Sequence, residues 1–208
     1  MLTIPSKKDT IHIATKPMTE EFIIGEMLKQ LIEDRTDLSV EITKGVGGGT
    51  SNIHPAMVKG DFDMYPEYTG TSWSFVLKKK EIPEHDILYK ELVREYKQQY
   101  HLEWTGLYGF NNTYGIAVTK ETAQRYHLKT YADLASVSSR MSFGAEYDYY
   151  ERDDGYDAMV KANDFHFKKS IDLDIGLKYD ALLKKEVDAI LVFTTDGRIS
   201  DPDIVVLQ

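Results

Sequence analysis

The pattern of apolar and polar positions predicts strands and helices in alternation. Residues 10–15 alternate apolar and polar side chains, as in a strand with one buried face. Residues 17–36 place apolar side chains at helical spacing, with Thr19 as the expected N-cap. Further elements are predicted in the order strand 38–43, a short helix capped by Thr50 or Ser51, and strand 60–65. This order favours a parallel sheet with helices on its faces.

The second half of the chain repeats the same order after a charged amphipathic helix over 84–100. Strands are predicted at 103–108, 113–120, 140–147, 165–173, 187–193 and 203–208. Helical segments are predicted within 120–134, 152–164 and 174–186. Residues 187–193 are apolar without a break, which is typical of a strand buried on both faces of a parallel sheet.

The repeated strand–helix order predicts two α/β lobes, 10–107 and 108–208, joined near the segment GLYGFNNTYG. Each lobe is expected to be a parallel-rich sheet flanked by helices. Clefts between lobes are common binding places for small molecules, so we expect a ligand there.

Composition narrows the function classes. The chain has 208 residues, a net charge of −9 and no cysteine. The charge argues against a nucleic-acid partner, and the absence of cysteine excludes disulfides, thiolate nucleophiles and Cys-based zinc sites. The six histidines lack ligand spacing and no Ser–His–Asp pattern is visible, so we expect no metal, no cofactor and no enzyme. No run of about 18 apolar residues predicts a membrane span, and the first ten residues do not resemble a signal peptide.

The glycine-rich turn Gly45–Thr50 has three interpretations. It resembles a dinucleotide-binding fingerprint, but Thr50 stands where the third glycine belongs and the turn follows the second strand rather than the first. It could also be a tight turn that needs small residues. In the third interpretation, the amides of Gly48, Gly49 and Thr50 face a ligand carboxylate.

Arg152 lies at a predicted strand-to-helix junction, where ligands of α/β proteins bind. Its planar guanidinium could hold a carboxylate with two parallel hydrogen bonds, or it could form a surface salt bridge. The adjacent Asp153 and Asp154 are interpreted as residues at a helix start rather than as a catalytic pair.

Aromatic residues gather at predicted strand ends. These are Tyr65, Tyr68 and Trp73 in the first half, and Tyr114, Tyr147, Tyr149, Tyr150 and Phe193 in the second. They could be the rim of a core. Rings from both lobes could instead form a cage for a quaternary ammonium group, which donates no conventional hydrogen bond and is attracted by ring faces.

Several segments resemble one family. GGGTSNIHPAMVKGDFDMYPEYTGT, FNNTYGIAV, ERDDGY and FTTDGRI are similar to segments of the substrate-binding proteins of glycine betaine/choline/carnitine ABC importers. The resemblance runs from about residue 10 to the end of the chain. It implies a two-lobed periplasmic-binding-protein (type II) fold that closes on its ligand. GGGTSNIHPA, TSWSFVLKKK and GFNNTYG look closer to the branch whose binding domain is fused to the permease, some of which takes ergothioneine.

The resemblance also implies a set of ligand-binding residues. Tyr68 and Tyr114 match cage tyrosines, and Phe193 stands where a cage tyrosine is usual. Arg152 matches an arginine that grips the ligand carboxylate. The polar positions that match or neighbour the site are Lys16, Thr71 and Asn112, with Gly48, Gly49, Thr50, Thr195 and Asp196 as secondary candidates.

Compared with the family pattern, the chain stops before a segment that returns to lobe one and adds another cage tyrosine. On this expectation lobe one is incomplete and the fold is truncated at its C-terminus. The implied partners are a quaternary ammonium ligand, an ABC permease and its ATPase. The implied place is outside the membrane, anchored as a lipoprotein or fused to the permease, with the anchor outside this chain. The alternatives are a nucleotide-binding enzyme that uses Gly45–Thr50, and a degenerate fragment that binds nothing.

Overall fold

A computed structural model describes residues 10–208, and it divides into two compact units, one ending at Leu107 and one spanning Tyr108–Gln208. Each unit is described by itself. Among residues 10–208, no helix is long and apolar enough to cross a membrane.

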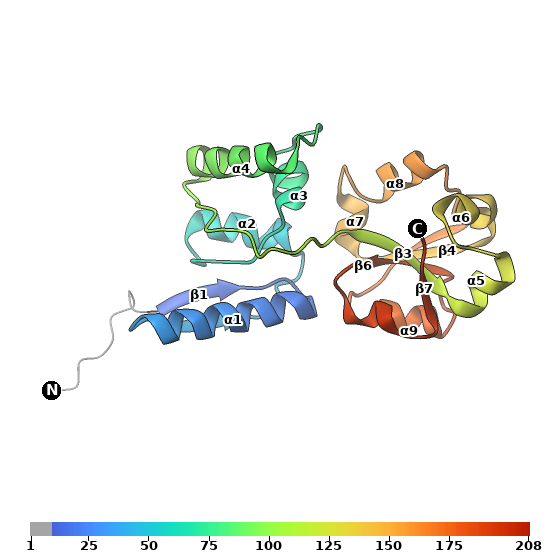
Figure 1. Cartoon of the computed structure of the whole chain (residues 1–208), viewed down its shortest axis with the longest axis horizontal. Helices are drawn as coiled ribbons and strands as arrows, with labels where there is room; N and C mark the ends of the chain where they lie inside the picture. The colour runs from blue at the N-terminus through green and yellow to red at the C-terminus, as the bar shows by residue number, and fades with distance from the viewer. Residues whose placement is uncertain (1–9) are drawn as a thin grey trace. The chain divides into compact units, whose positions relative to one another are not determined.

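Unit 1 is built on two parallel strands, β1 (Thr10–Ala14) and β2 (Ser39–Thr43), which pair in register from Thr10↔Ser39 to Ala14↔Thr43. The helix α1 (Thr19–Arg35) connects them and runs alongside the strands (Figure 1). These three elements agree with the sequence prediction. The N-cap does not, because Met18 occupies that position and no side chain caps the helix.

The predicted third strand at 60–65 is wrong as a strand. Met64 forms only an isolated parallel bridge to Ile13. The Asp63 carboxylate accepts from the His12 amide at 2.8 Å, so a side chain takes a place that a backbone carbonyl would hold in a ladder. Pro66 follows directly, and proline cannot donate to a ladder. Pairing therefore ends after one bridge.

The rest of unit 1 is helical. Its helices are α2 (Thr50–Lys59), α3 (Thr69–Thr71), the π-helical turn η2 (Ser72–Val76) and α4 (His85–Tyr100). Trp73, Leu88, Leu92 and Tyr96 form the buried cluster between η2 and α4. The predicted strand at 103–108 is absent from the described chain, where this segment has no regular structure. Trp104 packs on that cluster instead, 5.6 Å from the Tyr96 ring, so its apolar character reflects packing on α4.

Unit 2 contains a five-stranded sheet in the order β5-β4-β6-β3-β7. The strands are β3 (Tyr114–Thr119), β4 (Ser142–Ala145), β5 (Lys169–Asp172), β6 (Ala189–Phe193) and β7 (Ile204–Val206). β4 runs parallel to β5 and β6, whereas β3 runs antiparallel to β6 and β7. The sheet is therefore mixed, and β6 has one parallel and one antiparallel neighbour.

The helices of unit 2 cover both faces of this sheet. They are α5 (Lys120–Tyr126), α6 (Tyr131–Val137), α7 (Tyr147–Glu151), α8 (Tyr156–Asn163) and α9 (Lys178–Leu183), with the short 3-10 turns η3 (Ser138–Arg140) and η4 (Gly197–Ser200). The helix predicted over 152–164 starts only at Tyr156. Asp153 and Asp154 lie in the turn between α7 and α8, so their interpretation as helix-start residues is wrong.

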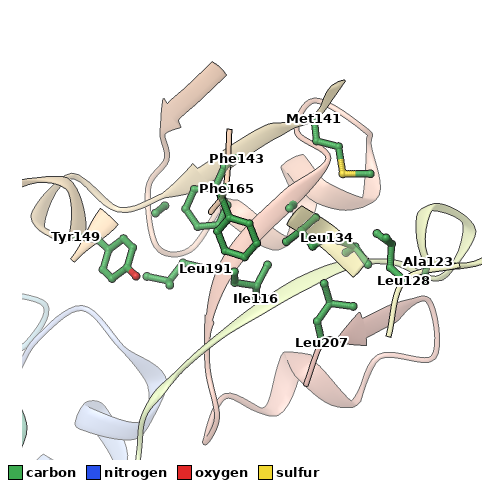
Figure 2. Packing of buried hydrophobic residues seen from close by; sticks show 13 residues of the cluster. Ile116, Ala123, Leu128, Leu134, Met141, Phe143, Tyr149, Phe165, Leu191 and Leu207 are labelled. Atoms are coloured by element: carbon green, nitrogen blue, oxygen red, sulfur yellow. The ribbon is translucent and has the colours of Figure 1, made fainter. Parts of the chain in front are cut away.

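Two buried clusters sandwich the sheet. Ile116, Val118 and Leu191 belong to one cluster, and Figure 2 shows Ile116 and Leu191 gathered near Phe165 at its centre. Ile190 and Val192 belong to the cluster on the other side. Since successive residues of β6 enter opposite clusters, this strand must be apolar at every position.

Candidate functional site

Unit 1 gathers several predicted ligand residues around one carboxylate, that of Glu67. Its Oε1 accepts from the Tyr68 amide at 2.7 Å and from the Lys16 ammonium. Its Oε2 accepts from the Thr50 hydroxyl at 2.7 Å. The Lys16 and Glu67 side chains are only 8% and 4% exposed. Glu67 is not among the ligand residues predicted from the sequence, but it joins three of them here.

The ring of Tyr68 lies against a cation that the protein itself supplies. The Lys16 Nζ is 4.7 Å from the ring centre, within the range of cation–π attraction. The Tyr68 hydroxyl donates to Glu20 Oε1. The ring is therefore held through both its face and its hydroxyl.

A second buried carboxylate, that of Glu21, adjoins this cluster. Its Oε2 lies 3.4 Å from the Lys16 amide, and its Oε1 has no hydrogen-bond partner among residues 10–208. Burial raises the pKa of Glu21 to about 7, with the Glu67 charge adding to the rise and Lys16 opposing it. Near neutral pH, the Glu21 carboxyl group therefore changes between its protonated and ionised forms.

The glycine-rich turn gives the chain its path from β2 into α2. Gly48 and Gly49 have φ of +74° and +48°, and a Cβ on Gly48 would come within 2.4 Å of the side-chain Nδ2 of Asn52. The Gly48 and Gly49 carbonyls accept from the Ser51 and Ile53 amides at 3.0 and 2.9 Å. Because the Glu67 carboxylate holds Thr50 at the start of α2, a phosphate at this turn would be repelled. These contacts favour the tight-turn interpretation over the nucleotide interpretation.

The remaining residues of this region have structural contacts. Trp73 is buried, and its Nε1 donates to the Glu81 carbonyl at 2.7 Å, so it is a core residue. The Tyr65 hydroxyl lies 3.4 Å from His54 Nδ1. Burial raises the pKa of Tyr65 and lowers that of His54. Thr71 is half-buried at the end of α3, three residues after Tyr68.

Unit 2 brings together three rings at one edge of its sheet. Tyr114 begins β3 and pairs in register with Phe193, the last residue of β6. Their ring centres are 5.7 Å apart, and Tyr149 of α7 meets Tyr114 edge-on at 5.0 Å. Tyr114 is 37% exposed, whereas Tyr149 is buried in the core. Tyr114 and Phe193, here called the ring pair, were both predicted.

Phe193 also contacts a cation that sequence reasoning did not identify. Lys178 is fully buried at the start of α9, its Nζ lies 4.2 Å from the Phe193 ring centre, and its ammonium pairs with Glu146. A signal was available, because Lys178 lies four residues before the buried Leu182 on the inner face of a predicted helix. A lysine on such a face indicates a buried ion pair.

Arg152 follows α7 directly and forms a bidentate pair with Asp154. Its Nε and Nη2 donate to the two carboxylate oxygens at 2.8 and 2.7 Å, and the arginine side chain is only 9% exposed. The salt-bridge alternative is therefore realised, although at a largely buried arginine rather than on the surface. Two of the five guanidinium N–H donors are engaged by Asp154. The prediction that Arg152 grips a ligand carboxylate stays a prediction.

The other candidates in unit 2 lie near the ring pair in sequence. Asn112 precedes β3 by two residues and is half-buried. Thr195 and Asp196 follow β6. The Asp196 amide donates to the Phe193 carbonyl at 3.0 Å, and its carboxylate accepts from the Arg198 amide at 3.0 Å. Asp196 thereby caps the turn η4. In the described part of the chain, no group of three or more His, Asp or Glu side chains could hold a metal ion.

Comparison with known proteins identifies the family. The family model named "Substrate binding domain of ABC-type glycine betaine transport system" (OpuAC) matches residues 9–208 of this chain. The chain belongs to this family.

Two curated relatives of this substrate-binding domain have named ligands. The ergothioneine transport permease/ergothioneine binding protein EgtU of Helicobacter pylori (strain G27) is 43% identical over 94% of this chain and 35% of its own length. The carnitine transport binding protein OpuCC of Listeria monocytogenes serotype 1/2a (strain 10403S) is 37% identical over 98% of this chain and 66% of its own length. The chain thus spans about a third of one relative and just under two thirds of the other.

Solved structures agree with this assignment. The crystal structure of a glycine betaine/carnitine/choline ABC transporter protein is similar to the substrate-binding domain with a TM-score of 0.67 and 32% identity. The match covers 96% of this chain and 73% of that one. The predicted family and the type II periplasmic-binding-protein fold class are therefore confirmed.

Proposed function

We propose that this domain captures a betaine-like zwitterion, a compound with a trimethylammonium group and a carboxylate, for an ABC importer. The observation that carries the proposal is the ring pair at the edge of the unit 2 sheet, with Tyr114 partly exposed. A trimethylammonium group has no N–H to donate, so ring faces stabilise it better than hydrogen-bond acceptors do. Tyr114 and Phe193 are its proposed contacts in unit 2.

The carboxylate of the ligand is assigned to Arg152. A guanidinium is planar and presents its donors in a fixed fork, which is the geometry that matches a carboxylate. Asn112, Thr195 and Asp196 are the proposed polar neighbours in unit 2.

The proposed contacts of unit 1 are Tyr68, Lys16 and Thr71, with Gly48, Gly49 and Thr50 as secondary candidates. Glu67 supports this assignment because its carboxylate holds Lys16, Thr50 and the Tyr68 backbone together. The acidic side chains around Tyr68 favour a positively charged ligand group.

The relatives suggest what works with this domain. EgtU is named both as a permease and as a binding protein, and OpuCC is named as a transport binding protein. We propose a permease, fused or separate, and an ATPase as partners, and a place outside the membrane. We expect capture without chemical change, so the ligand is recovered unaltered after incubation, as NMR of the released compound would show.

Isothermal titration calorimetry tests the proposal. Glycine betaine, carnitine, choline and ergothioneine are titrated into the 208-residue chain and, in parallel, into the complete product of its gene. We expect binding of at least one zwitterion. If neither protein binds any of the four compounds, the proposed function is wrong. NAD and ATP in the same series test the nucleotide alternative, and we expect neither to bind.

Two pairs of variants assign the residues. Tyr114→Ala should weaken binding of every trimethylammonium compound about tenfold or more. Tyr126→Ala, a partly buried ring of the same unit that packs on the core, should not. Arg152→Ala should weaken glycine betaine far more than choline, whereas Arg140→Ala should leave both unchanged. Equal losses for glycine betaine and choline in Arg152→Ala would remove its assigned role.

A further inference from the structure

A buried lysine contacts the ring pair of unit 2, and neither the sequence pattern nor the family resemblance assigned it a role. Lys178 has no exposed surface, its ammonium pairs with Glu146, and its Nζ lies 4.2 Å from the Phe193 ring centre. An ammonium is costly to bury, and an ion pair offsets that cost only in part. The placement of this charge therefore requires an explanation beyond packing.

The ion pair connects the end of β4 with α9, next to the end of β6 that carries Phe193. Glu146 directly follows β4, Phe193 ends β6, and Lys178 begins α9. β4 and β6 are parallel, so their carboxyl ends share one edge of the sheet, where Tyr114 pairs with Phe193. This is the edge at which α/β sheets bind ligands. Glu146 is also the N-cap of α7, which carries Tyr149.

The same ion pair places two opposite charges at this edge. Glu146 is 17% exposed and its charge is offset by Lys178. Without the lysine, the carboxylate would attract any ligand with a net positive charge to the ring pair. Without the carboxylate, the ammonium at the Phe193 ring would repel such a ligand. A zwitterion responds less to either change because its two charges oppose each other.

We propose that Lys178 positions the ring pair and determines its specificity: held by Glu146, it fixes the Phe193 ring and makes the pair favour a zwitterion over a net cation. This inference rests on the proposed function. It concerns residues that the ligand itself need not touch.

The affinity ratio of choline to glycine betaine tests the charge effect. The two compounds share the trimethylammonium group, and choline carries a hydroxyl in place of the carboxylate. By calorimetry at pH 6, Lys178→Met should raise the ratio about tenfold, and Glu146→Gln should lower it by a similar factor. Glu121→Gln, which breaks the exposed pair with Lys185 in the same unit, should leave the ratio unchanged.

A purely structural role predicts a different result. Both variants would then weaken choline and glycine betaine alike, and an unchanged ratio would overturn the proposal. Should a single variant fail to fold, the double variant Lys178→Met/Glu146→Gln removes both charges together. We expect its ratio to return to the wild-type value while both affinities fall about tenfold, because the Phe193 ring is no longer fixed. Wild-type affinity for both compounds would contradict the positioning role.

NMR supplies a readout that needs no ligand, so it separates this inference from the proposed function. The side-chain protons next to the Lys178 ammonium should be shifted upfield by the Phe193 ring. Phe193→Leu should remove most of that shift and leave the smaller part due to Tyr179, whose ring centre lies 5.7 Å from Lys178 Nζ. Phe167→Leu, which changes another ring of the unit, should leave the shift unchanged. A Lys178 resonance at the ordinary position in the wild type would overturn the positioning role, even if every betaine binds.

Discussion

Each unit contains a buried lysine–glutamate pair with an aromatic ring beneath the ammonium. In unit 1 the set is Lys16, Glu67 and Tyr68, with the ammonium 4.7 Å from the ring centre. In unit 2 the set is Lys178, Glu146 and Phe193, and the ammonium lies 4.2 Å from the centre of the Phe193 ring. The two sets arise from unrelated segments and different elements. In both, a ring that the family resemblance assigns to a ligand cation already contacts a cation of the protein.

The two sets differ in their charge balance. Glu67 accepts three hydrogen bonds, and a second buried carboxylate, Glu21, lies beside Lys16. Lys178 has Glu146 as its carboxylate, and the lysine is more deeply buried than Lys16. The unit 1 set therefore adjoins a carboxyl group whose pKa is raised to about 7, whereas the unit 2 set is a lysine–glutamate pair that is more deeply buried. The predictions below test this contrast from the largest expected effect to the smallest.

Removal of the carboxylate should affect unit 2 more than unit 1. Glu146→Gln leaves Lys178 fully buried without its ion pair and should lower the free energy of unfolding by about 3 kcal/mol. Glu67→Gln should cost about 1 kcal/mol, because Glu21 can take over part of the pairing with Lys16. Urea unfolding separates the units, since Trp73 and Trp104 both lie in unit 1 and circular dichroism reports on both. Equal losses of unfolding free energy in Glu146→Gln and Glu67→Gln would contradict the expected difference between the two units.

The stability of unit 1 should depend on pH through Glu21. Its pKa is about 7 in the folded protein and 4.5 in an unperturbed chain, so the folded state binds the proton more tightly. The free energy of unfolding should therefore fall by about 1.4 kcal/mol per pH unit as pH rises from 4.5 to 7, and this contribution levels off above pH 7. Tryptophan fluorescence in urea at several pH values measures the slope.

Glu21→Gln should flatten this slope, because its amide does not titrate. The matched control is Glu26→Gln on the same helix, which removes a half-exposed carboxylate paired with Lys44. An unchanged slope in Glu21→Gln would show that another group titrates.

Replacement of the ring should distinguish the two sets less strongly. Phe193→Leu and Tyr68→Leu each remove the cation–π contact and should cost about 1 kcal/mol, with the larger loss in unit 2. Tyr68→Phe keeps the ring and removes the hydrogen bond to Glu20, so it should cost less than Tyr68→Leu. Urea unfolding followed by tryptophan fluorescence and by circular dichroism measures the loss of unfolding free energy in each variant. A larger loss for Tyr68→Leu than for Phe193→Leu would contradict the prediction.

An exposed ion pair provides the smallest expected effect. In unit 2 the Lys185 Nζ lies 2.6 Å from Glu121 Oε2, and both side chains are more than half exposed. Glu121→Gln should leave the urea midpoint of unfolding nearly unchanged, because solvent screens an exposed ion pair. A loss as large as that of Glu146→Gln would mean that burial is not what distinguishes the lysine–glutamate pairs.

Local periodicity predicted the regular elements well and failed where a single contact overrode it. β1, α1, β2, α4 and β6 lie where the pattern indicates. The segments 60–65 and 103–108 have the composition of strands, but Asp63 interrupts the first ladder and Trp104 packs the second onto α4. The direction of β3 within the sheet was also missed, because an apolar run buried on both faces looks the same beside a parallel or an antiparallel neighbour.

The sequence by itself determined the family, the α/β elements and which residues are candidates for the ligand, because these depend on local patterns and matched motifs. Only the tertiary structure placed Lys16 at the Tyr68 ring, Lys178 at the Phe193 ring and Asp154 on Arg152. Lys16 and Glu67 are 51 positions apart, and Lys178 and Glu146 are 32 apart. No local pattern encodes such pairs, because they form only when the folded chain excludes water from both charges at once.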